Sequence, residues 1–494
     1  MPAPKTLEAL AGEYRAVREA TMAMSPVPIP QNHPLDFSAL GLAYQGLKQR
    51  NHVAVLINRA LRRPLISALP IEVQINNIGW CNLRCPQCPT HGTDELHAVY
   101  QSKSHTMSRG AIEKIARETF AHTKKVCTSG TGEGLLHKDL DAIIDNAARY
   151  GVQFFTNTNG TTLLPKLVGS LFGITELRLS IDGATPVAFE AVRRGAKYQK
   201  VMRNVLATTR ANERLPATLR LIPSVNFGIC ASNVRDVPVM VDLCAFLGLS
   251  AIHAFRIVPL NPKYDADDIE KYPAYYKHYY LQAMQRARAR NLVVNLPAPD
   301  PNVAPDPNAG PGEAGMIVTG LDDAYYARLP AFDQLIDTTG IEDDIGAMMR
   351  AALEAGIARH AAAKPAAVRE AAEQARDLDA ALTADLQRGL GALSADEVAR
   401  LQAMHTSDKL VADCFFLQAH LIYEADGAVK PCCLPSFETI GDASTSPREL
   451  LASKRLLAVV EEFRTGRFRP DCATCSMNQR VPERHLFPIA LGSG

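Results

Sequence analysis

Between residues 71 and 297, short apolar runs alternate with segments whose apolar residues recur at helical spacing. Strands are expected at 71–78, 125–129, 153–157, 176–181, 218–225 and 251–258. Helices are expected between them, for example at 108–122, 139–150 and 234–247. Alternation of this kind predicts an α/β fold with parallel strands and right-handed crossovers, in which the chemistry lies at the carboxyl ends of the strands.

The first strand is followed by Cys81, Cys85 and Cys88, at the spacing C-x-x-x-C-x-x-C. Three thiolates leave one corner of a four-iron cubane without a protein ligand, so a substrate or cofactor can bind the open iron. The alternatives are a zinc site or three unrelated thiols. Zinc sites favour paired C-x-x-C or mixed Cys/His sets that close four positions, and no partner pair lies nearby in the sequence.

Polar residues follow the carboxyl ends of the next three strands. The segment Ser-Gly-Thr-Gly-Glu-Gly at 129–134 lets the backbone pass close to a ligand, and its Glu133 offers a carboxylate to an ammonium group. Asn159 and Gly160 follow the third strand, a pattern that by itself is typical of a turn. On the fourth strand, Ser180 and Asp182 point the same way because strand side chains alternate.

The segment Cys81-Asn-Leu-Arg-Cys85, with Pro89 after the third cysteine, resembles the cluster loop of the radical S-adenosylmethionine (SAM) enzymes. The resemblance implies a partial (β/α)6 TIM-like barrel and a [4Fe-4S] cluster whose open iron binds SAM. In that family one electron from the cluster cleaves SAM, and the 5′-deoxyadenosyl radical removes a hydrogen atom from the substrate. Gln87 departs from the family, because the residue before the third cysteine is often aromatic or aliphatic.

The resemblance also implies which residues hold SAM. Segment 132–134 resembles part of the Gly-Gly-Glu-Pro motif that holds the SAM amino group, with Gly134 in place of the proline. Arg193 stands where the family has an arginine that pairs with the SAM carboxylate, and the alternatives are Arg194 or a solvent-facing role. The residues expected to bind SAM are Gly132, Glu133, Asn159, Ser180, Asp182 and Arg193.

The sixth strand contributes two candidates for contact with the substrate, His253 and Arg256. One of them is expected to act as a proton acceptor or an anchor at the catalytic centre. A lone histidine or arginine on a strand is nevertheless more often structural, so a structural role is the alternative for each.

A second group of cysteines lies after residue 410, around a strand-like run at 415–423, an Asp-Gly hairpin signal at 424–428 and a helical stretch at 446–463. Four thiolates there would close either a second [4Fe-4S] cluster or a zinc site, and the spacing alone does not choose between them. The arrangement resembles the SPASM and twitch auxiliary-cluster domains of radical SAM enzymes, with the single-cluster twitch type the better match. The implied ligands are Cys414, Cys432, Cys472 and Cys475, with Cys433 the alternative to Cys432.

A chain of 494 residues is expected to contain more than one unit. We expect an N-terminal helical extension at 1–70, the barrel at 71–297, a proline-rich linker and helical insertion at 298–410, the auxiliary-cluster domain at 411–480 and a tail at 481–494. Helical periodicity at 341–364 and 366–404 indicates that the insertion is a helical spacer, partly disordered.

Composition narrows the expected partners. A net charge of +1 gives no reason to expect nucleic acid or an acidic membrane, and neither a signal peptide nor a membrane-spanning run is evident. Eleven cysteines in such a chain favour metal ligation in the cytoplasm over a disulfide framework. The expected partners are a flavodoxin- or ferredoxin-type electron donor and a small-molecule or peptide substrate.

The resemblance implies an oxidoreductase, because a fully ligated auxiliary cluster suits electron transfer. The leading reaction is a net two-electron oxidation of a small-molecule or peptide natural product, either a dehydrogenation or a cross-link. A radical SAM epimerase or methylase is the alternative, and a zinc-stabilised binding protein without activity is a remote one. The products separate these possibilities: oxidation removes two hydrogens, epimerisation keeps the mass and methylation increases it.

Overall fold

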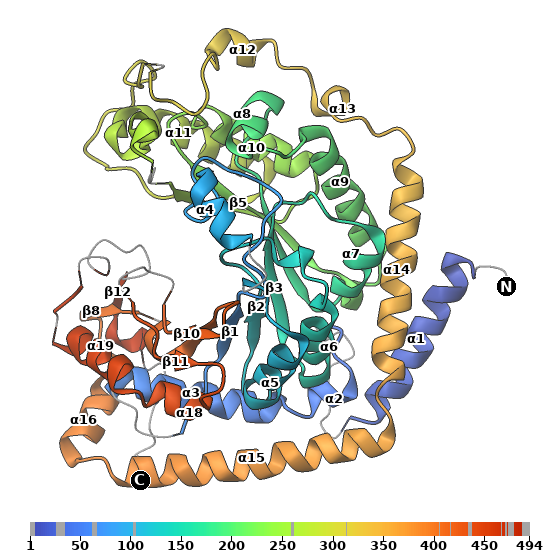
Figure 1. The fold of residues 1–494 in the computed structure, drawn as a ribbon, viewed down its shortest axis with the longest axis vertical. Helices are drawn as coiled ribbons and strands as arrows, with labels where there is room; N and C mark the ends of the chain where they lie inside the picture. Colours follow the sequence, from blue (N-terminus) through green and yellow to red (C-terminus); the bar gives the residue numbers. More distant parts are fainter. Residues whose placement is uncertain are drawn as a thin grey trace.

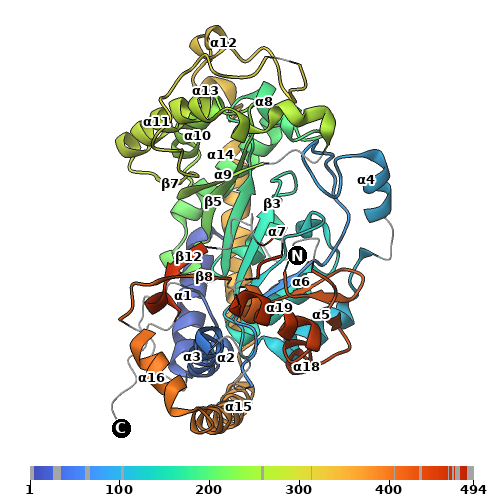
Figure 2. The same cartoon turned by 90° about the vertical axis from the view of Figure 1, so that its left-hand side faces the viewer.

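The computed structural model describes residues 5–25, 35–61, 67–101, 105–257, 261–312, 314–404, 406–414, 416–432, 437–465, 467–469, 472 and 479–486. The described strands form a ten-stranded sheet in the order β11-β10-β9-β1-β2-β3-β4-β5-β6-β7 and a separate β12-β8 pair. Because β7 and β11 lie at opposite ends of the larger sheet, that sheet is open, which confirms the predicted α/β partial barrel (Figures 1 and 2).

Neighbouring strands from β1 to β7 pair in parallel. Their bounds are β1 Glu72–Ile75, β2 Lys125–Cys127, β3 Gln153–Thr158, β4 Thr175–Ser180, β5 Ile222–Ile229, β6 Ala251–Arg256 and β7 Val293–Asn295. The connecting helices are α4 Asp94–Tyr100, α5 Arg109–Thr119, α6 Leu140–Tyr150, α7 Pro165–Leu171, α8 Pro186–Val192, α9 Tyr198–Arg214, α10 Asp236–Phe246 and α11 Pro273–Arg290. On the outer face, fully buried residues such as Phe154 and Leu177 belong to the main hydrophobic core.

The inner face of the strands is polar and only partly buried, unlike the packed apolar interior of a closed barrel. Lys125 Nζ lies 2.8 Å from Glu176 Oε2, and Arg178 Nη2 lies 2.8 Å from Glu176 Oε1. The two cationic groups lie 4.4 Å and 4.8 Å from the ring centre of Phe155. By the two-residue period, Arg178 is one layer below Ser180, at the carboxyl end of the same strand. The barrel interior therefore presents charged and aromatic groups to whatever enters it.

Two details of the predicted barrel were wrong. The fifth strand runs four residues later than expected, because 217–219 form a 3₁₀ turn and alternate side chains remain buried through Phe227 and Ile229. Asn226 and Gly228, which interrupt the apolar pattern, lie on the opposite face of that strand. The sequence also gave no sign of β7, since a three-residue strand is too short to show alternation.

The insertion is not the spacer that we expected. Helix α14 (Ile341–Ala361) packs against α7, α9 and the N-terminal helix α1 (Leu7–Ala23), and it buries Ile345, Met348 and Leu353. Helix α15 (Pro365–Gly391) runs beneath α2 (Ala39–Leu42) and α3 (Gln45–Leu61), so that α14 and α15 frame two sides of the molecule (Figure 1). The remaining helices of the insertion are α12 Asp323–Ala327, α13 Phe332–Leu335 and α16 Ala395–Met404.

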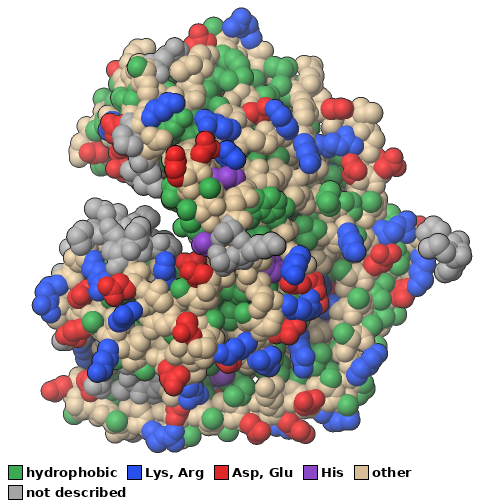
Figure 3. Space-filling view, viewed as in Figure 1, with side chains coloured by type: hydrophobic (Ala, Val, Ile, Leu, Met, Phe, Trp, Pro, Cys, Tyr) green, Lys and Arg blue, Asp and Glu red, His purple; other side chains and the backbone are tan. Residues whose placement is uncertain are grey.

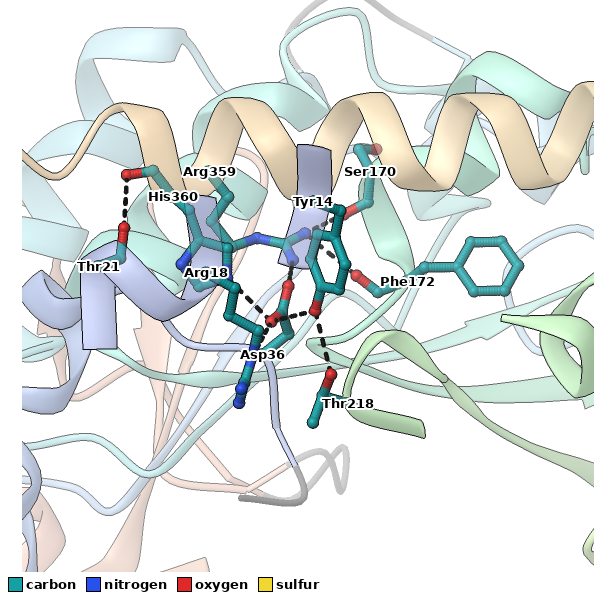
Figure 4. Close-up of polar contacts among 9 residues, drawn as sticks. All are labelled: Tyr14, Arg18, Thr21, Asp36, Ser170, Phe172, Thr218, Arg359 and His360. Atoms are coloured by element: carbon teal, nitrogen blue, oxygen red, sulfur yellow. Dashed lines mark hydrogen bonds and ion pairs between the residues drawn. The ribbon is translucent and has the colours of Figure 1, made fainter. Parts of the chain in front are cut away.

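A buried charge cluster fastens α1 and α14 to the barrel (Figure 4). Asp36 is fully buried, and its Oδ1 accepts from Tyr14 Oη at 2.6 Å and Arg18 Nε at 3.1 Å. His360 Nε2 lies 2.9 Å from the same oxygen, and Arg359 donates to Oδ2 at 2.9 Å. Arg359 also donates to the backbone carbonyls of residues 170 and 172, which end α7. Segments far apart in the sequence therefore share one carboxylate at the amino end of the barrel.

The C-terminal segment extends the barrel sheet. Strand β9 pairs in parallel with β1, and β10 returns antiparallel to it through a turn in which Gly427 has a φ of 92°, as the Asp-Gly signal predicted. The run expected as one strand at 415–423 instead contains a helical turn before β9. The bounds are β8 Leu410–Asp413, α17 Phe416–Ala419, β9 His420–Tyr423, β10 Ala428–Lys430, β11 Gly441–Asp442, α18 Pro447–Leu451, α19 Lys454–Arg464 and β12 Gln479–Pro482. In the described parts of the chain, no helix has the length and apolar character needed to span a bilayer.

Candidate active site

A cavity of about 500 Å³ lies at the carboxyl ends of the barrel strands. This size suits a cofactor or small ligand. Figure 3 shows the molecule hollowed on one side, between the α10–α11 region and the C-terminal part of the sheet. Ten of the predicted site residues line the cavity: Cys81, Cys85, Cys88, Gly132, Glu133, Asn159, Ser180, Asp182, Arg193 and Arg256.

Each cysteine sulfur at this cavity has a polar neighbour. Leu83 N donates to Cys81 Sγ at 3.4 Å, and Thr90 Oγ1 lies 3.3 Å from Cys88 Sγ. Burial raises the pKa of Cys81 to about 12 and that of Cys85 to about 11, although the Arg193 charge opposes the shift at Cys85. These thiols are therefore protonated without metal, and iron would have to displace their protons.

Among the described residues, no three His, Cys, Asp or Glu side chains are placed to hold one metal ion together. A cubane does not require the three thiolates to meet at one metal ion, because each thiolate binds a separate iron and the sulfurs stand apart. The three cysteines line one cavity, which is consistent with that arrangement.

Glu133 is buried beside the cysteine loop. Its carboxylate accepts from Thr158 Oγ1 at 2.7 Å and from Asn159 N at 2.9 Å, and its own backbone N donates to Trp80 O at 2.9 Å. Burial raises the pKa of this carboxyl, although these hydrogen bonds and the charge of Arg193 oppose the shift. Glu133 therefore offers a fixed anionic group that gains from a nearby cation.

Arg193 lines the cavity and forms an ion pair with Asp182. Its Nε lies 2.6 Å from Asp182 Oδ2, and it also hydrogen-bonds the Cys85 sulfur. Asp182 Oδ1 accepts from Gly228 N at 2.7 Å, while Gln87 Nε2 lies 3.3 Å from Oδ2. The buried Oε1 of Gln87 has no hydrogen-bond partner. It is an acceptor available to a donor group of a ligand in this cavity.

Asn159 connects the third strand to the cysteine loop. Its Nδ2 donates to Asn82 Oδ1 at 2.9 Å, and its Oδ1 accepts from Thr161 N at 3.0 Å and Thr161 Oγ1 at 2.6 Å. A turn with these contacts positions the loop as well as lining the cavity.

The two candidate residues on β6, Arg256 and His253, have different surroundings. Arg256 lines the cavity and pairs with Glu270 at 3.1 Å, whereas His253 is not among the lining residues and lies 3.3 Å from Asn295 Nδ2. The sequence reasoning did not select Phe255, whose side chain lines the cavity and is 50% exposed, nor did it select His91. A lone histidine after a cysteine motif gives no sequence signal, because its partners lie on other segments.

Three of the C-terminal cysteines predicted as ligands are described. Cys432 and Cys472 are buried in the main core, and Cys414 packs against it. Cys475 and the alternative ligand, Cys433, lie outside the described residues.

Comparison with known proteins places the cysteine loop in a family. Residues 75–222 match the sequence model of the radical SAM superfamily. This part of the chain is a radical SAM domain. The match includes Cys81, Cys85 and Cys88 and extends through the strands that precede Glu133, Asn159 and Asp182.

Relatives of the radical SAM domain differ in activity. An AdoMet-dependent heme synthase of Methanosarcina barkeri is 22% identical over 42% of this chain and 57% of its own length. A probable GTP 3′,8-cyclase of Methanococcus vannielii is 26% identical over 37% of this chain and 57% of its own length. The chain thus spans little more than half of each of these relatives.

Solved structures found to be similar include anSMEcpe with bound AdoMet and SuiB of Streptococcus suis. The first is 13% identical, with a TM-score of 0.45, and the match covers 84% of this chain and 90% of that one. SuiB is 10% identical, with a TM-score of 0.46, and the match covers 83% of this chain and 71% of that one.

The cofactors of a radical SAM domain are a [4Fe-4S] cluster and SAM. The residues present fit both, because three cysteines and the Glu133 carboxyl line the same cavity. We propose that Cys81, Cys85 and Cys88 ligate the cluster.

Replacing Glu133 with Gln tests its proposed contact with the SAM ammonium. A hydrogen bond to a charged group contributes about 1.5–3 kcal/mol, so we expect SAM binding to weaken by about tenfold or more. Equilibrium dialysis with labelled SAM measures this effect, with the exposed Glu113→Gln on α5 as the matched control. Unchanged affinity in the Glu133 variant would remove this residue from the SAM site.

The same variant has an expected effect on stability. Because the folded-state pKa of Glu133 is raised, the group's contribution to stability is greatest below the unfolded pKa and declines as pH rises through the folded pKa. The neutral glutamine avoids this cost, so the variant is expected to have a higher Tm than the wild type at pH 7. The difference should disappear below about pH 4, where both forms are neutral. Thermal unfolding at both pH values measures it.

Proposed function

We propose that this protein is a radical SAM oxidoreductase that removes two electrons from a small-molecule or peptide natural product. The observation that carries the proposal is that three cysteines and the polar residues Glu133 and Asp182 line one cavity at the carboxyl end of the barrel. The cluster and SAM together supply a 5′-deoxyadenosyl radical for hydrogen abstraction. A flavodoxin- or ferredoxin-type donor would supply the reducing electron.

The proposed roles of the protein side chains follow from their contacts. Glu133 holds the SAM ammonium, while Ser180 and Asp182 bind ribose hydroxyls or the amino group. Arg193 is assigned to the SAM carboxylate, and its bond to Asp182 fixes its guanidinium in place. Asn159 holds the cysteine loop against the third strand through Asn82. These contacts keep SAM aligned with the substrate, on which hydrogen abstraction depends.

The substrate is proposed to enter along the inner face of the half-barrel. Arg256 and Phe255 line the cavity, and Lys125, Glu176 and Arg178 form a partly exposed charged layer on the inner face. A surface with both charge signs and an aromatic ring suits a polar substrate better than a purely apolar one. His253 lies on the same strand as Arg256 and stays a candidate for this inner layer.

Electron removal is assigned to an auxiliary [4Fe-4S] cluster ligated by Cys414, Cys432, Cys472 and Cys475. Support comes from the attachment of this segment to the barrel, since β9 pairs with β1, the strand that leads into the cysteine loop. Asn76 Nδ2, just after β1, also donates to Glu424 Oε2 at 2.8 Å. The cysteine loop after β1 and Cys432 after β10 would therefore be attached to the same sheet.

Anaerobic reconstitution with iron and sulfide tests the two-cluster assignment. We expect about eight irons per chain, falling to about four in the Cys472→Ala/Cys475→Ala variant, because each cubane holds four irons. Turnover should yield one 5′-deoxyadenosine and a product lighter by two hydrogens, as mass spectrometry can measure. A product of unchanged mass would indicate an epimerase, and zinc without iron would indicate a binding protein.

A further inference from the structure

His91 is a buried histidine between two segments that line the candidate site. Its Nε2 lies 3.0 Å from Gly79 O, just before the cysteine loop, and 2.9 Å from Thr131 O, in the glycine-rich segment 129–134. Its side chain is 2% exposed and lines the cavity. One ring nitrogen therefore contacts both segments at once.

The partners of His91 determine its tautomer. Both oxygens near Nε2 are carbonyl acceptors, so Nε2 carries the proton and Nδ1 of the neutral ring is an acceptor. Nδ1 lies 3.1 Å from His97 Nδ1, which must then be the donor, and His97 Nε2 accepts from Gln101 Nε2 at 2.7 Å. Burial lowers the pKa of both histidines, which favours this neutral arrangement. Helix α4 thus orients the His91 ring through a chain of hydrogen bonds.

The start of the cysteine loop and the glycine-rich segment 129–134 are in direct contact. Glu133 N donates to Trp80 O, and a Cβ at Gly132 would collide with the same carbonyl oxygen. Thr131 O also accepts from Thr90 Oγ1 at 2.9 Å, so two donors saturate that carbonyl. Thr90 and His91, which follow the cysteine loop, therefore hold the peptide group between Thr131 and Gly132 in place.

We propose that His91 is a positioning residue, which holds the glycine-rich segment against the cysteine loop so that Glu133 faces bound SAM. The proposal rests on the SAM-binding role given to this cavity above. His91 acts through Gly79 and Thr131 and does not itself ligate iron. Losing the clamp should loosen segment 129–134 and weaken SAM binding while the three cysteine sulfurs remain able to hold iron.

Two isosteric replacements separate this role from simple packing. In His91→Gln the side-chain amide nitrogen can reach the position of Nε2 and still donate to both carbonyls. In His91→Asn the amide oxygen can take the position of Nδ1 and accept from His97, but the shorter side chain places no donor at the position of Nε2, so the contact with His97 is kept and the clamp is lost. Both are measured in the full-length reconstituted chain, by iron content and by the SAM-induced change in the spectrum of the reduced cluster.

We expect His91→Asn to keep the iron content of the wild type and bind SAM about tenfold more weakly, as expected for a lost buried hydrogen bond. His91→Gln should bind SAM within about threefold of the wild type. Equal losses in both variants, no loss in His91→Asn, or loss of iron in parallel with SAM would overturn the proposal.

Hydrogen exchange distinguishes this proposal from the function on which it rests. In the full chain without iron, backbone amides at 129–134 should exchange faster in His91→Asn than in the wild type and at the wild-type rate in His91→Gln. Unchanged exchange in His91→Asn would refute the clamp. Failure of the wild type to bind iron or SAM, with the exchange difference present, would instead refute the proposed function.

Discussion

Replacing Cys85 with Ala is expected to remove about four irons per reconstituted chain and to abolish formation of 5′-deoxyadenosine. Cys85 is buried in the cavity wall, and its sulfur accepts from Arg193. Two remaining thiols leave two of the four irons without protein ligands, so the cubane should not survive. Iron analysis and chromatography of the products measure the two effects.

The matched control for this experiment is Cys244→Ala. Cys244 is fully buried on α10 and does not line the cavity, so its loss changes packing without touching the candidate site. This control should keep both its iron and its SAM cleavage. Equal iron content in Cys85→Ala and wild type would show that another group of residues binds the metal.

Replacing Asp36 with Asn is expected to lower the free energy of unfolding by about 3–5 kcal/mol, the usual cost of breaking a buried ion pair. The carboxylate compensates Arg18 and the almost fully buried Arg359. An amide keeps the shape but removes the negative charge that both guanidinium groups contact. Urea unfolding monitored by circular dichroism measures the loss.

Two further variants define the mechanism of that loss. Glu13→Gln removes an exposed ion pair with Lys5 and should change stability by less than about 1 kcal/mol. Asp36→Asn/Arg359→Met removes both buried charges and should recover part of the lost stability. Unchanged stability in Asp36→Asn would contradict the role given to this cluster.

The effect of Asp36 depends on pH. Burial alone would raise the pKa of its carboxyl, but the hydrogen bond from His360 and the charge of Arg359 outweigh burial and lower it. A lowered folded-state pKa contributes stability above the unfolded pKa and loses it as pH falls through the folded value. The difference between the wild type and Asp36→Asn should therefore be full at pH 7 and shrink only in strong acid.

The sequence was enough to predict that several candidate site residues would lie around one cavity. Cys81, Glu133 and Asp182 follow separate parallel strands, and strand ends share one edge of a sheet, so local patterns were enough to bring them together. His91 was missed because its acceptors come from segments about 12 and 40 residues away, a pairing that no local pattern records.

The long-range contacts of the insertion and of the C-terminal segment could not be predicted for a related reason. Helical periodicity correctly located α14, but it could not show that Arg359 and His360 meet a carboxylate more than 300 residues earlier. Likewise, the hairpin signal at 424–428 located a turn and gave no information that β9 would join the barrel at β1. Long-range pairing of this kind depends on tertiary packing rather than on local propensity.

The most direct test of the central claim is electron paramagnetic resonance of the reduced, reconstituted chain with and without SAM, using Cys472→Ala/Cys475→Ala so that one cluster remains. If Cys81, Cys85 and Cys88 hold a cubane with an open iron, SAM should change the g values of the signal, and in Glu133→Gln the same change should need an about tenfold higher SAM concentration. An iron–sulfur signal that SAM leaves unchanged in the Cys472→Ala/Cys475→Ala chain would contradict it.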